Sequence, residues 1–371
     1  MPLTLVNNLI ARPQTRQDAV KYFPSVQGFR GFSAFSVLIE HIYRMAQNGG
    51  FASTFSRSAD LALPTLGNAV ALFFIISGFV IPASLVRHGD LRRFFFDRLL
   101  RILPVFVAIH LLVFSVGPLV GYKWFAGADV GQYLTLFFSN LTFTAPLLHL
   151  PLAQQNSWTL TYEWLFYIFI AIFWFAGTRT RHPAPALAVL TVVGVLVCLR
   201  YPMCWYFLVG LAFAQFRSIP VRVGRAVEIV VVPLTFVAFY GLAQYGGDYW
   251  AIPFGAVIFW FVLQDGTLTS KLLQSRVMQF IGLISYSLYL VHPIVMYPLQ
   301  AIGGHLVRRG FSPDLVFPAF AVASVGLAIA ASYVSYRLLE VGARRRLTIW
   351  VNRHTRDRDV VPPTGSRVSL P

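Results

Sequence analysis

Charge is scarce in this sequence of 371 residues. Only 12% of the residues are Asp, Glu, Lys or Arg and 57% are hydrophobic, whereas a typical soluble domain is about 25% charged and about 45–50% apolar. This composition excludes a soluble globular protein and also a disordered chain. Cysteine is scarce too: Cys198 and Cys204 are too few for a disulfide framework or a cysteine-based metal site. We expect both to pack in helices as small apolar residues. A single disulfide between them is the alternative.

Signatures of soluble enzymes are also missing. The sequence has no Walker loop, no dinucleotide fingerprint, no His-Glu-x-x-His motif and no Gly-x-Ser-x-Gly elbow, and we expect no metal site. A cleavable signal is not expected, because the apolar run at 5–11 is interrupted by Asn7 and Asn8 and is too short. Residues 12–22 read instead as a basic, water-exposed lead-in.

Long apolar stretches are what the sequence has in abundance, and its mean hydropathy is +0.65. Such stretches predict helices that cross a lipid bilayer. The net charge of +16 then reflects Lys and Arg on cytoplasmic loops rather than a surface for nucleic acid. The eleven candidate stretches are 31–48, 66–86, 102–121, 132–149, 158–177, 185–199, 203–216, 227–245, 250–265, 277–300 and 314–336.

The basic residues also predict the orientation. Clusters at 12–30, 87–101 and 337–367 belong in the cytoplasm, so both termini are cytoplasmic and the number of crossings is even. We read the stretch 132–149 as re-entrant, because this reading keeps Arg181 in the cytoplasm. Non-helical backbone at membrane depth is tolerated where protein or a water-filled cavity surrounds it.

The predicted fold is therefore an all-α transmembrane bundle of about ten crossings and one re-entrant segment, with both termini cytoplasmic. Residues 1–340 are expected to form the membrane domain. Residues 341–371 are expected to form a basic, flexible cytoplasmic tail.

Ionisable residues inside a membrane are costly and mark functional sites by default. Arg30 and His41 are eleven residues apart, which places them on one helix face with a separation of about 16 Å. Arg30 would lie near the cytoplasmic headgroups and His41 near mid-membrane, where an imidazole exchanges a proton near neutral pH; a structural, hydrogen-bonded His41 is the alternative. Glu40 has Arg44 four residues on, so an ion pair is the favoured interpretation and a direct chemical role the alternative.

Later stretches add further candidates. Arg98 and Arg101 share a helix face, either as a fork for phosphate oxygens or as a basic cluster that sets the topology. Glu163 lies one to two turns into its apolar stretch with Tyr167 four residues on, and it needs an arginine, a histidine or a water cavity as partner. His292 precedes a proline and is more often structural than catalytic in such a setting.

In order, these stretches resemble the integral-membrane acyltransferase family 3, which includes bacterial O-antigen and exopolysaccharide O-acetylases. The resemblance covers nearly the whole chain and begins with an arginine, ten residues and a histidine. Its five motifs are QGFRGF at 27–32 running to His41, FFIISGF at 73–79, Arg98-x-x-Arg101 before ILP at 102–104, WTLTYE at 158–163 with FY at 166–167, and YSLYLVHP at 286–293.

Two features depart from the family pattern. Many relatives carry two acidic residues in the fifth-span motif, whereas Trp164 follows Glu163 here, so any role of a second carboxylate is lost. Some relatives append a soluble esterase-like domain, which this chain is too short to hold.

The resemblance implies a membrane-bound O-acyltransferase of a bacterial inner membrane. It would move an acyl group, most often acetyl, from cytoplasmic acyl-CoA (acetyl-CoA) to a hydroxyl of a lipid-linked or extracytoplasmic glycan. His41 would act as general base or as a transiently acylated nucleophile, and Glu163 would orient His41 or the acceptor hydroxyl. The other expected site residues are Arg30, Arg98 and Arg101 for CoA binding, and Ser77, Tyr167 and His292 as lining.

Two other functions stay open on the residues alone. A proton-coupled small-molecule transporter would also use buried ionisable residues and a re-entrant segment, although the two halves show no matching pair of Gly/Pro-interrupted spans. A non-catalytic membrane partner of a glycan-assembly complex is the other. The sequence does not predict the acceptor sugar, the acylated position, the acyl group or the oligomeric state.

Overall fold

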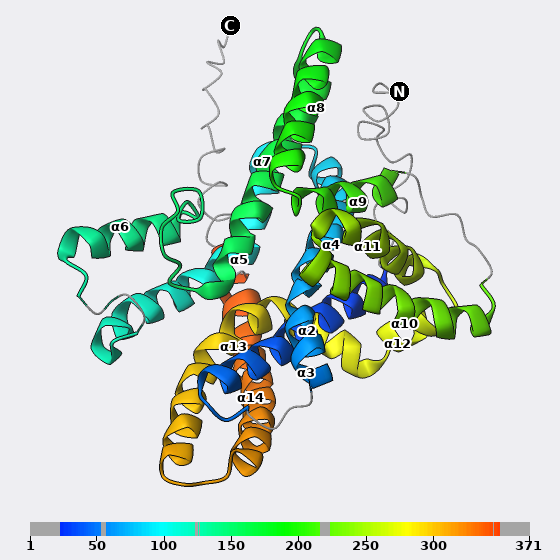
Figure 1. Ribbon diagram of the computed structural model, residues 1–371. Helices are drawn as coiled ribbons and strands as arrows, with labels where there is room; N and C mark the ends of the chain where they lie inside the picture. The colour runs from blue at the N-terminus through cyan, green and yellow to red at the C-terminus, as the bar shows by residue number, and fades with distance from the viewer. Residues whose placement is uncertain are drawn as a thin grey trace, which may run out of the picture.

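The computed structural model describes residues 23–52, 57–122, 125, 127–215, 223–343 and 345–348, so the predicted lead-in and most of the predicted tail lie outside it. Within these ranges every regular element is a helix and no strand occurs, which confirms the all-α prediction (Figure 1). The α-helices are α2 (Pro24–Asn48), α3 (Arg57–Ala62), α4 (Ala69–His88), α5 (Leu91–Val116), α6 (Val130–Leu141), α7 (Trp158–Arg179), α8 (Pro183–Arg200), α9 (Cys204–Gln215), α10 (Arg225–Gly241), α11 (Asp248–Leu263), α12 (Leu268–Leu273), α13 (Arg276–Arg308) and α14 (Pro313–Ser335).

Seven helical segments of the described chain are long and apolar enough to cross a membrane. They are Arg57–His88, Leu91–Val116, Gln155–Arg179, Pro183–Arg200, Arg225–Gly246, Arg276–Arg308 and Pro313–Thr348. Helices α9 and α11 are apolar but shorter, and α2 carries Arg30, Glu40 and Arg44 along its length. Each of the eleven apolar stretches read from the sequence overlaps one helix. The count of ten crossings and the cytoplasmic termini stay predictions.

The stretch 132–149 is only partly helical. Helix α6 begins at a capping box on Asp129 and ends at Leu141, after which the chain turns back without regular structure. Asn140 ties down this return, since its Nδ2 donates to the Pro151 carbonyl at 3.0 Å and its Oδ1 accepts from the Ala153 amide at 2.9 Å. Figure 1 shows α6 at the periphery beside α5. Entry of this segment into the membrane stays a prediction.

The start of α5 and the end of α7 meet at one end of the bundle. Arg92 and Arg179 line the same pocket there, together with Gly89 at the end of α4. The re-entrant reading of 132–149 requires the start of α5 and the end of α7 to lie on one side of the membrane, because it places Arg179 on the same side as the basic cluster at 87–101.

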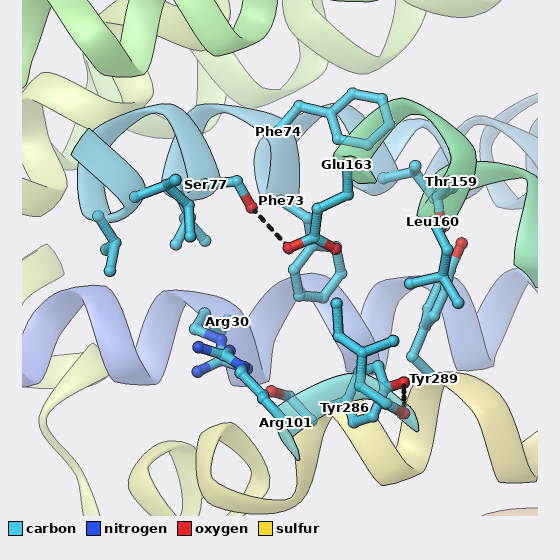
Figure 2. A pocket seen from close by; sticks show the side chains of 16 residues that line it. Arg30, Phe73, Phe74, Ser77, Arg101, Thr159, Leu160, Glu163, Tyr286 and Tyr289 are labelled. Carbon is cyan, nitrogen blue, oxygen red and sulfur yellow. Dashed lines mark hydrogen bonds between the residues drawn. The ribbon is translucent and has the colours of Figure 1, made fainter. Parts of the chain in front are cut away.

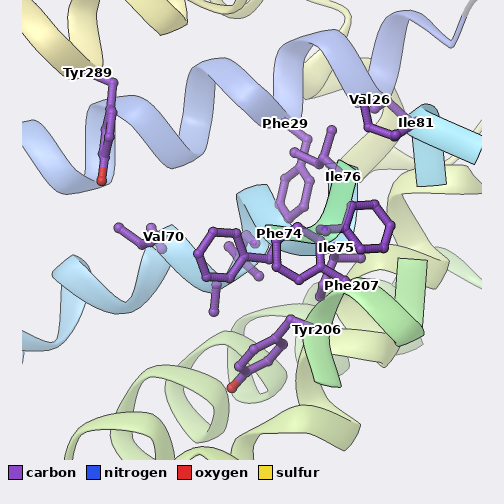
Figure 3. Packing of buried hydrophobic residues seen from close by; sticks show 14 of the residues in the cluster. Val26, Phe29, Val70, Phe74, Ile75, Ile76, Ile81, Tyr206, Phe207 and Tyr289 are labelled. Atoms are coloured by element: carbon purple, nitrogen blue, oxygen red, sulfur yellow. The ribbon is translucent and has the colours of Figure 1, made fainter. Parts of the chain in front are cut away.

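The bundle's central helices are packed backbone to backbone. A Cβ added to Gly28 of α2 would lie 1.8 Å from the Leu273 carbonyl oxygen, and one added to Gly282 of α13 would lie 2.1 Å from the Gln27 carbonyl oxygen. Glycine permits such close approach between membrane helices. An apolar cluster that includes Phe29, Phe74, Ile75, Tyr206 and Phe207 joins α2, α4 and α9 (Figure 3).

Cys198 and Cys204 are free thiols. Cys198 is buried, as expected for a small residue packed in a helix, and Cys204 is half-buried. At the other end of the chain, a π-helix at Tyr336–Ala343 continues α14 past residue 340. The domain boundary placed there by the sequence stays a prediction.

Candidate active site

A cavity of about 100 Å³ lies between α2, α4, α5, α7 and α13. Four of the expected site residues line it, each from a different helix: Arg30, Ser77, Arg101 and Glu163. Figure 2 shows Arg30 and Arg101 together on one side of the cavity and the Ser77–Glu163 pair on the other. The sequence analysis assigned these residues to one site but predicted no contact between them. The structure places all four around one cavity.

The basic side of the cavity holds two like charges. Arg30 interacts electrostatically with Arg101 and with the carboxylates of Glu340 and Glu163. Glu340 is already engaged, because it accepts from the Ser287 hydroxyl at 2.6 Å and the Ser287 amide at 3.1 Å. Two guanidiniums in a partly enclosed space favour an anionic group between them.

Glu163 is the acidic group that lines the cavity. The Tyr167 hydroxyl, four residues on along α7, donates to its Oε1, a hydrogen bond that the sequence did not predict, and the Ser77 hydroxyl reaches the same oxygen at 3.5 Å. Tyr167 is buried behind Glu163 and does not itself line the cavity. Across the cavity, Tyr286 donates to the Ile102 carbonyl at 2.8 Å, which joins α13 to α5.

His41 lies outside the cavity lining but is buried beside it. Its Nδ1 is 2.9 Å from the Val37 carbonyl oxygen and 3.0 Å from Glu40 Oε2. Both neighbours can only accept, so Nδ1 carries a proton and the lone pair of a neutral His41 is on Nε2. Glu40 Oε1 also accepts from Arg44 Nε at 2.5 Å.

Glu40 has one partner that the sequence predicted and one that it did not. The expected ion pair with Arg44 is present. Glu40 also contacts His41, which the helix spacing did not predict, because consecutive helix residues do not ordinarily face each other. Spacing alone does not report such a contact, since it depends on the side-chain rotamers.

His292 pairs with His41. Their rings are 4.9 Å apart and nearly perpendicular, and the His292 Nδ1 donates to the Leu288 carbonyl at 2.6 Å. Its Nε2 is buried without a hydrogen-bond partner among the described residues. Tyr289 lines the cavity, and its ring is 6.5 Å from that of His292. The two imidazoles therefore lie behind Tyr289 rather than on the cavity wall.

Arg98 and Arg101 have different surroundings instead of forming one fork. Arg101 lines the cavity, whereas Arg98 is buried against Asp97 at 2.5 Å and the Ser84 hydroxyl of α4 at 3.3 Å. Two nitrogens of Arg98, Nε and Nη1, are buried without a partner among the described residues. Burying unpaired donors of a charged group is costly, so Arg98 retains capacity for an anionic ligand.

The described residues contain no group of three His, Cys, Asp or Glu side chains that could hold a metal ion. The chemical groups in and beside the cavity are two buried imidazoles, one carboxylate with a tyrosine partner, and three arginines.

Comparison with known proteins identifies the family of this chain. A family model described as an acyltransferase domain, acyltransferase family 3, matches residues 23–337. "Acyltransferase MdmB" of Streptomyces mycarofaciens is 25% identical, over 87% of this chain and 92% of that protein. No solved structure matches.

Two longer relatives are also similar. A protein of Staphylococcus aureus strain COL named "Putative O-acetyltransferase" is 23% identical over 89% of this chain and 59% of that protein. "Putative peptidoglycan O-acetyltransferase YrhL" of Bacillus subtilis strain 168 is 24% identical over 78% and 52%. The chain thus spans little more than half the length of these two.

Proposed function

The chain belongs to acyltransferase family 3, and from that premise we propose that it transfers an acyl group, with acetyl expected, from acyl-CoA to a hydroxyl of a lipid-linked or extracytoplasmic glycan. The names of two relatives, "Putative O-acetyltransferase" and "Putative peptidoglycan O-acetyltransferase", support acetyl as the group and a glycan as the acceptor. Membership of this family favours an enzyme over a proton-coupled transporter.

The observation that carries the proposal is the cavity on which Arg30, Arg101, Ser77 and Glu163 converge. A thioester carbonyl develops negative charge as it is attacked, and the two guanidiniums on one side of the cavity provide a preorganised environment for that charge. In a bacterial inner membrane with the predicted orientation, Arg30 and Arg101 face the compartment that contains CoA. Arg98 would add phosphate contacts on the same side.

His41 is the group proposed to handle the proton or the acyl group. Its Nδ1 proton is fixed by Val37 and Glu40, so Nε2 is the atom that reacts. As a base, Nε2 takes the proton of the acceptor hydroxyl, the oxygen bonds to the acyl carbon, and the C–S bond breaks. The proton then passes to the departing thiolate, which leaves as CoA thiol. As a nucleophile, Nε2 would carry the acyl group between donor and acceptor.

Glu163, fixed by Tyr167, is proposed to orient the acceptor hydroxyl. The carboxylate in contact with His41 is Glu40, which leaves Glu163 for a role inside the cavity. The side chain of His41 is 11% exposed although it does not line the cavity. Tyr289 separates the imidazole from the cavity, so a substrate would reach His41 through its exposed part.

Transfer of labelled acetyl from acetyl-CoA by the purified protein in detergent tests the proposal. The His41→Ala and His41→Gln variants should lose transfer, and Arg98→Ala with Arg101→Ala should weaken CoA binding. Label trapped on His41 without acceptor would indicate the nucleophilic route, and its absence at full activity the base route. Undiminished transfer by both His41 variants would remove His41 from the chemistry, and wild-type protein without transfer would refute the function.

A further inference from the structure

A second pocket, of about 370 Å³, lies where α4 ends, α5 begins and α7 ends. Its side chains include Arg92, Arg179, Trp174 and Asp90. Asp90 is engaged, because it caps α5 and its Oδ1 accepts from the Arg93 amide at 2.9 Å. The pocket is therefore lined by two arginines and a tryptophan, residue types that bind a phosphorylated aromatic ligand.

The pocket and the cavity are bordered by the same two helices, α4 and α7. Along α4, Ser77 of the cavity and Gly89 of the pocket are about 18 Å apart. Along α7, Glu163 and Trp174 are about 16 Å apart. Two helices thus give nearly the same spacing between the pocket and the reacting groups.

That spacing matches the arm of the donor. From its phosphate to its sulfur, pantetheine has about thirteen bonds and extends about 16 Å. A nucleotide bound in the pocket could therefore present its thioester between Ser77 and Glu163.

Arg98 lies between the pocket and the cavity along α5. It follows Arg92 and precedes Arg101 on α5, and it contacts Ser84, which lies between Ser77 and Gly89 on α4. Its two buried nitrogens without partners among the described residues are donors along this route, and the amide carbonyls of a pantetheine arm are acceptors that would satisfy them.

We propose that the pocket formed by Arg92, Trp174 and Arg179 binds the phosphorylated adenosine end of the acyl donor, with the pantetheine arm passing Arg98 to the cavity. This inference rests on the acyl-CoA donor proposed above. In it, Arg92 and Arg179 contact phosphate oxygens and Trp174 packs against the base.

The test compares two donors in full-length protein reconstituted in nanodiscs. Acetyl-CoA carries the nucleotide, whereas S-acetylpantetheine has the same reacting end without it. The variant is Arg92→Gln with Arg179→Gln. The matched control is Arg93→Gln with Arg181→Gln, which removes the same charge from neighbouring positions that do not line the pocket.

The pocket variant should raise the KM for acetyl-CoA by about tenfold to a hundredfold, as expected for the loss of charge-assisted contacts. Its kcat, and its kcat/KM for S-acetylpantetheine, should equal those of the control. Trp174→Leu should also raise the KM for acetyl-CoA only, and adenosine 3′,5′-bisphosphate should inhibit the wild type more strongly than either pocket variant.

Three results would overturn the inference. Equal KM values for acetyl-CoA in the pocket variants and the control would refute it while leaving the proposed function intact. Equal losses with both donors, present only in nanodiscs with anionic lipid, would assign the pocket to a lipid headgroup. A wild type that does not use acetyl-CoA would refute the proposed function and this inference with it.

Discussion

Replacing Glu40 by glutamine isolates the contact between Glu40 and His41. Glutamine keeps an oxygen that can accept from Nδ1 but removes the negative charge 3.0 Å from the ring. When His41 accepts a proton during transfer, that charge stabilises the imidazolium. A hydrogen bond between charged groups contributes about 1.5–3 kcal/mol. At about 1.4 kcal/mol per tenfold in rate, kcat should fall by about tenfold to a hundredfold.

The assay is steady-state acetyl transfer, with kcat and KM measured separately and folding checked by thermal shift. We expect the KM for acetyl-CoA to stay constant, because Glu40 does not line the donor cavity. Arg44→Gln is the matched control, since it removes the other partner of Glu40, leaves the His41 contact, and changes a side chain that is 53% exposed. A folded Glu40→Gln enzyme with wild-type kcat would show that the contact has no role in turnover.

Three further results are expected. Gly282→Ala should lower the free energy of unfolding by about 1–3 kcal/mol, seen as a lower melting temperature in a thermal-shift assay, because its Cβ would meet the Gln27 backbone and both helices would have to move. Asp90→Ala should lower the melting temperature near neutral pH. The Arg93 amide lowers the pKa of the Asp90 carboxyl, so its stabilisation exists above the ordinary pKa and disappears as pH falls through the lowered one; a melting difference unchanged in acid would contradict this. A reporter fused near Arg181 should be cytoplasmic, and an extracytoplasmic signal would reject the re-entrant reading of 132–149.

Helix positions and shared faces were predictable because they depend on local periodicity. The eleven apolar stretches each overlap a helix, and the four-residue spacing of Glu163 and Tyr167 places both on one face of α7, where the structure shows a hydrogen bond that the sequence did not predict. The separation of Arg98 from Arg101 was not predictable, because it depends on which neighbouring helix each side chain meets. The His41–His292 contact joins residues far apart in sequence, so its prediction requires the packing of α2 against α13.

The pocket formed by Arg92, Trp174 and Arg179 was also missed. Its residues looked like ordinary loop charges and interfacial aromatics, and neither type marks a ligand site by itself. Only the meeting of the α5 start with the α7 end turns them into one concave surface.

The glycine contacts between α2 and α13 limit how this protein can move. Because a Cβ at Gly282 of α13 would lie 2.1 Å from the Gln27 carbonyl oxygen of α2, the two main chains touch there, and neither helix can slide by a residue past the other without a collision. The two imidazoles, one on each helix, are therefore held at a constant separation throughout a reaction cycle. Any widening that admits donor or acceptor has to come from the opposite wall, where α5 and α7 border the cavity.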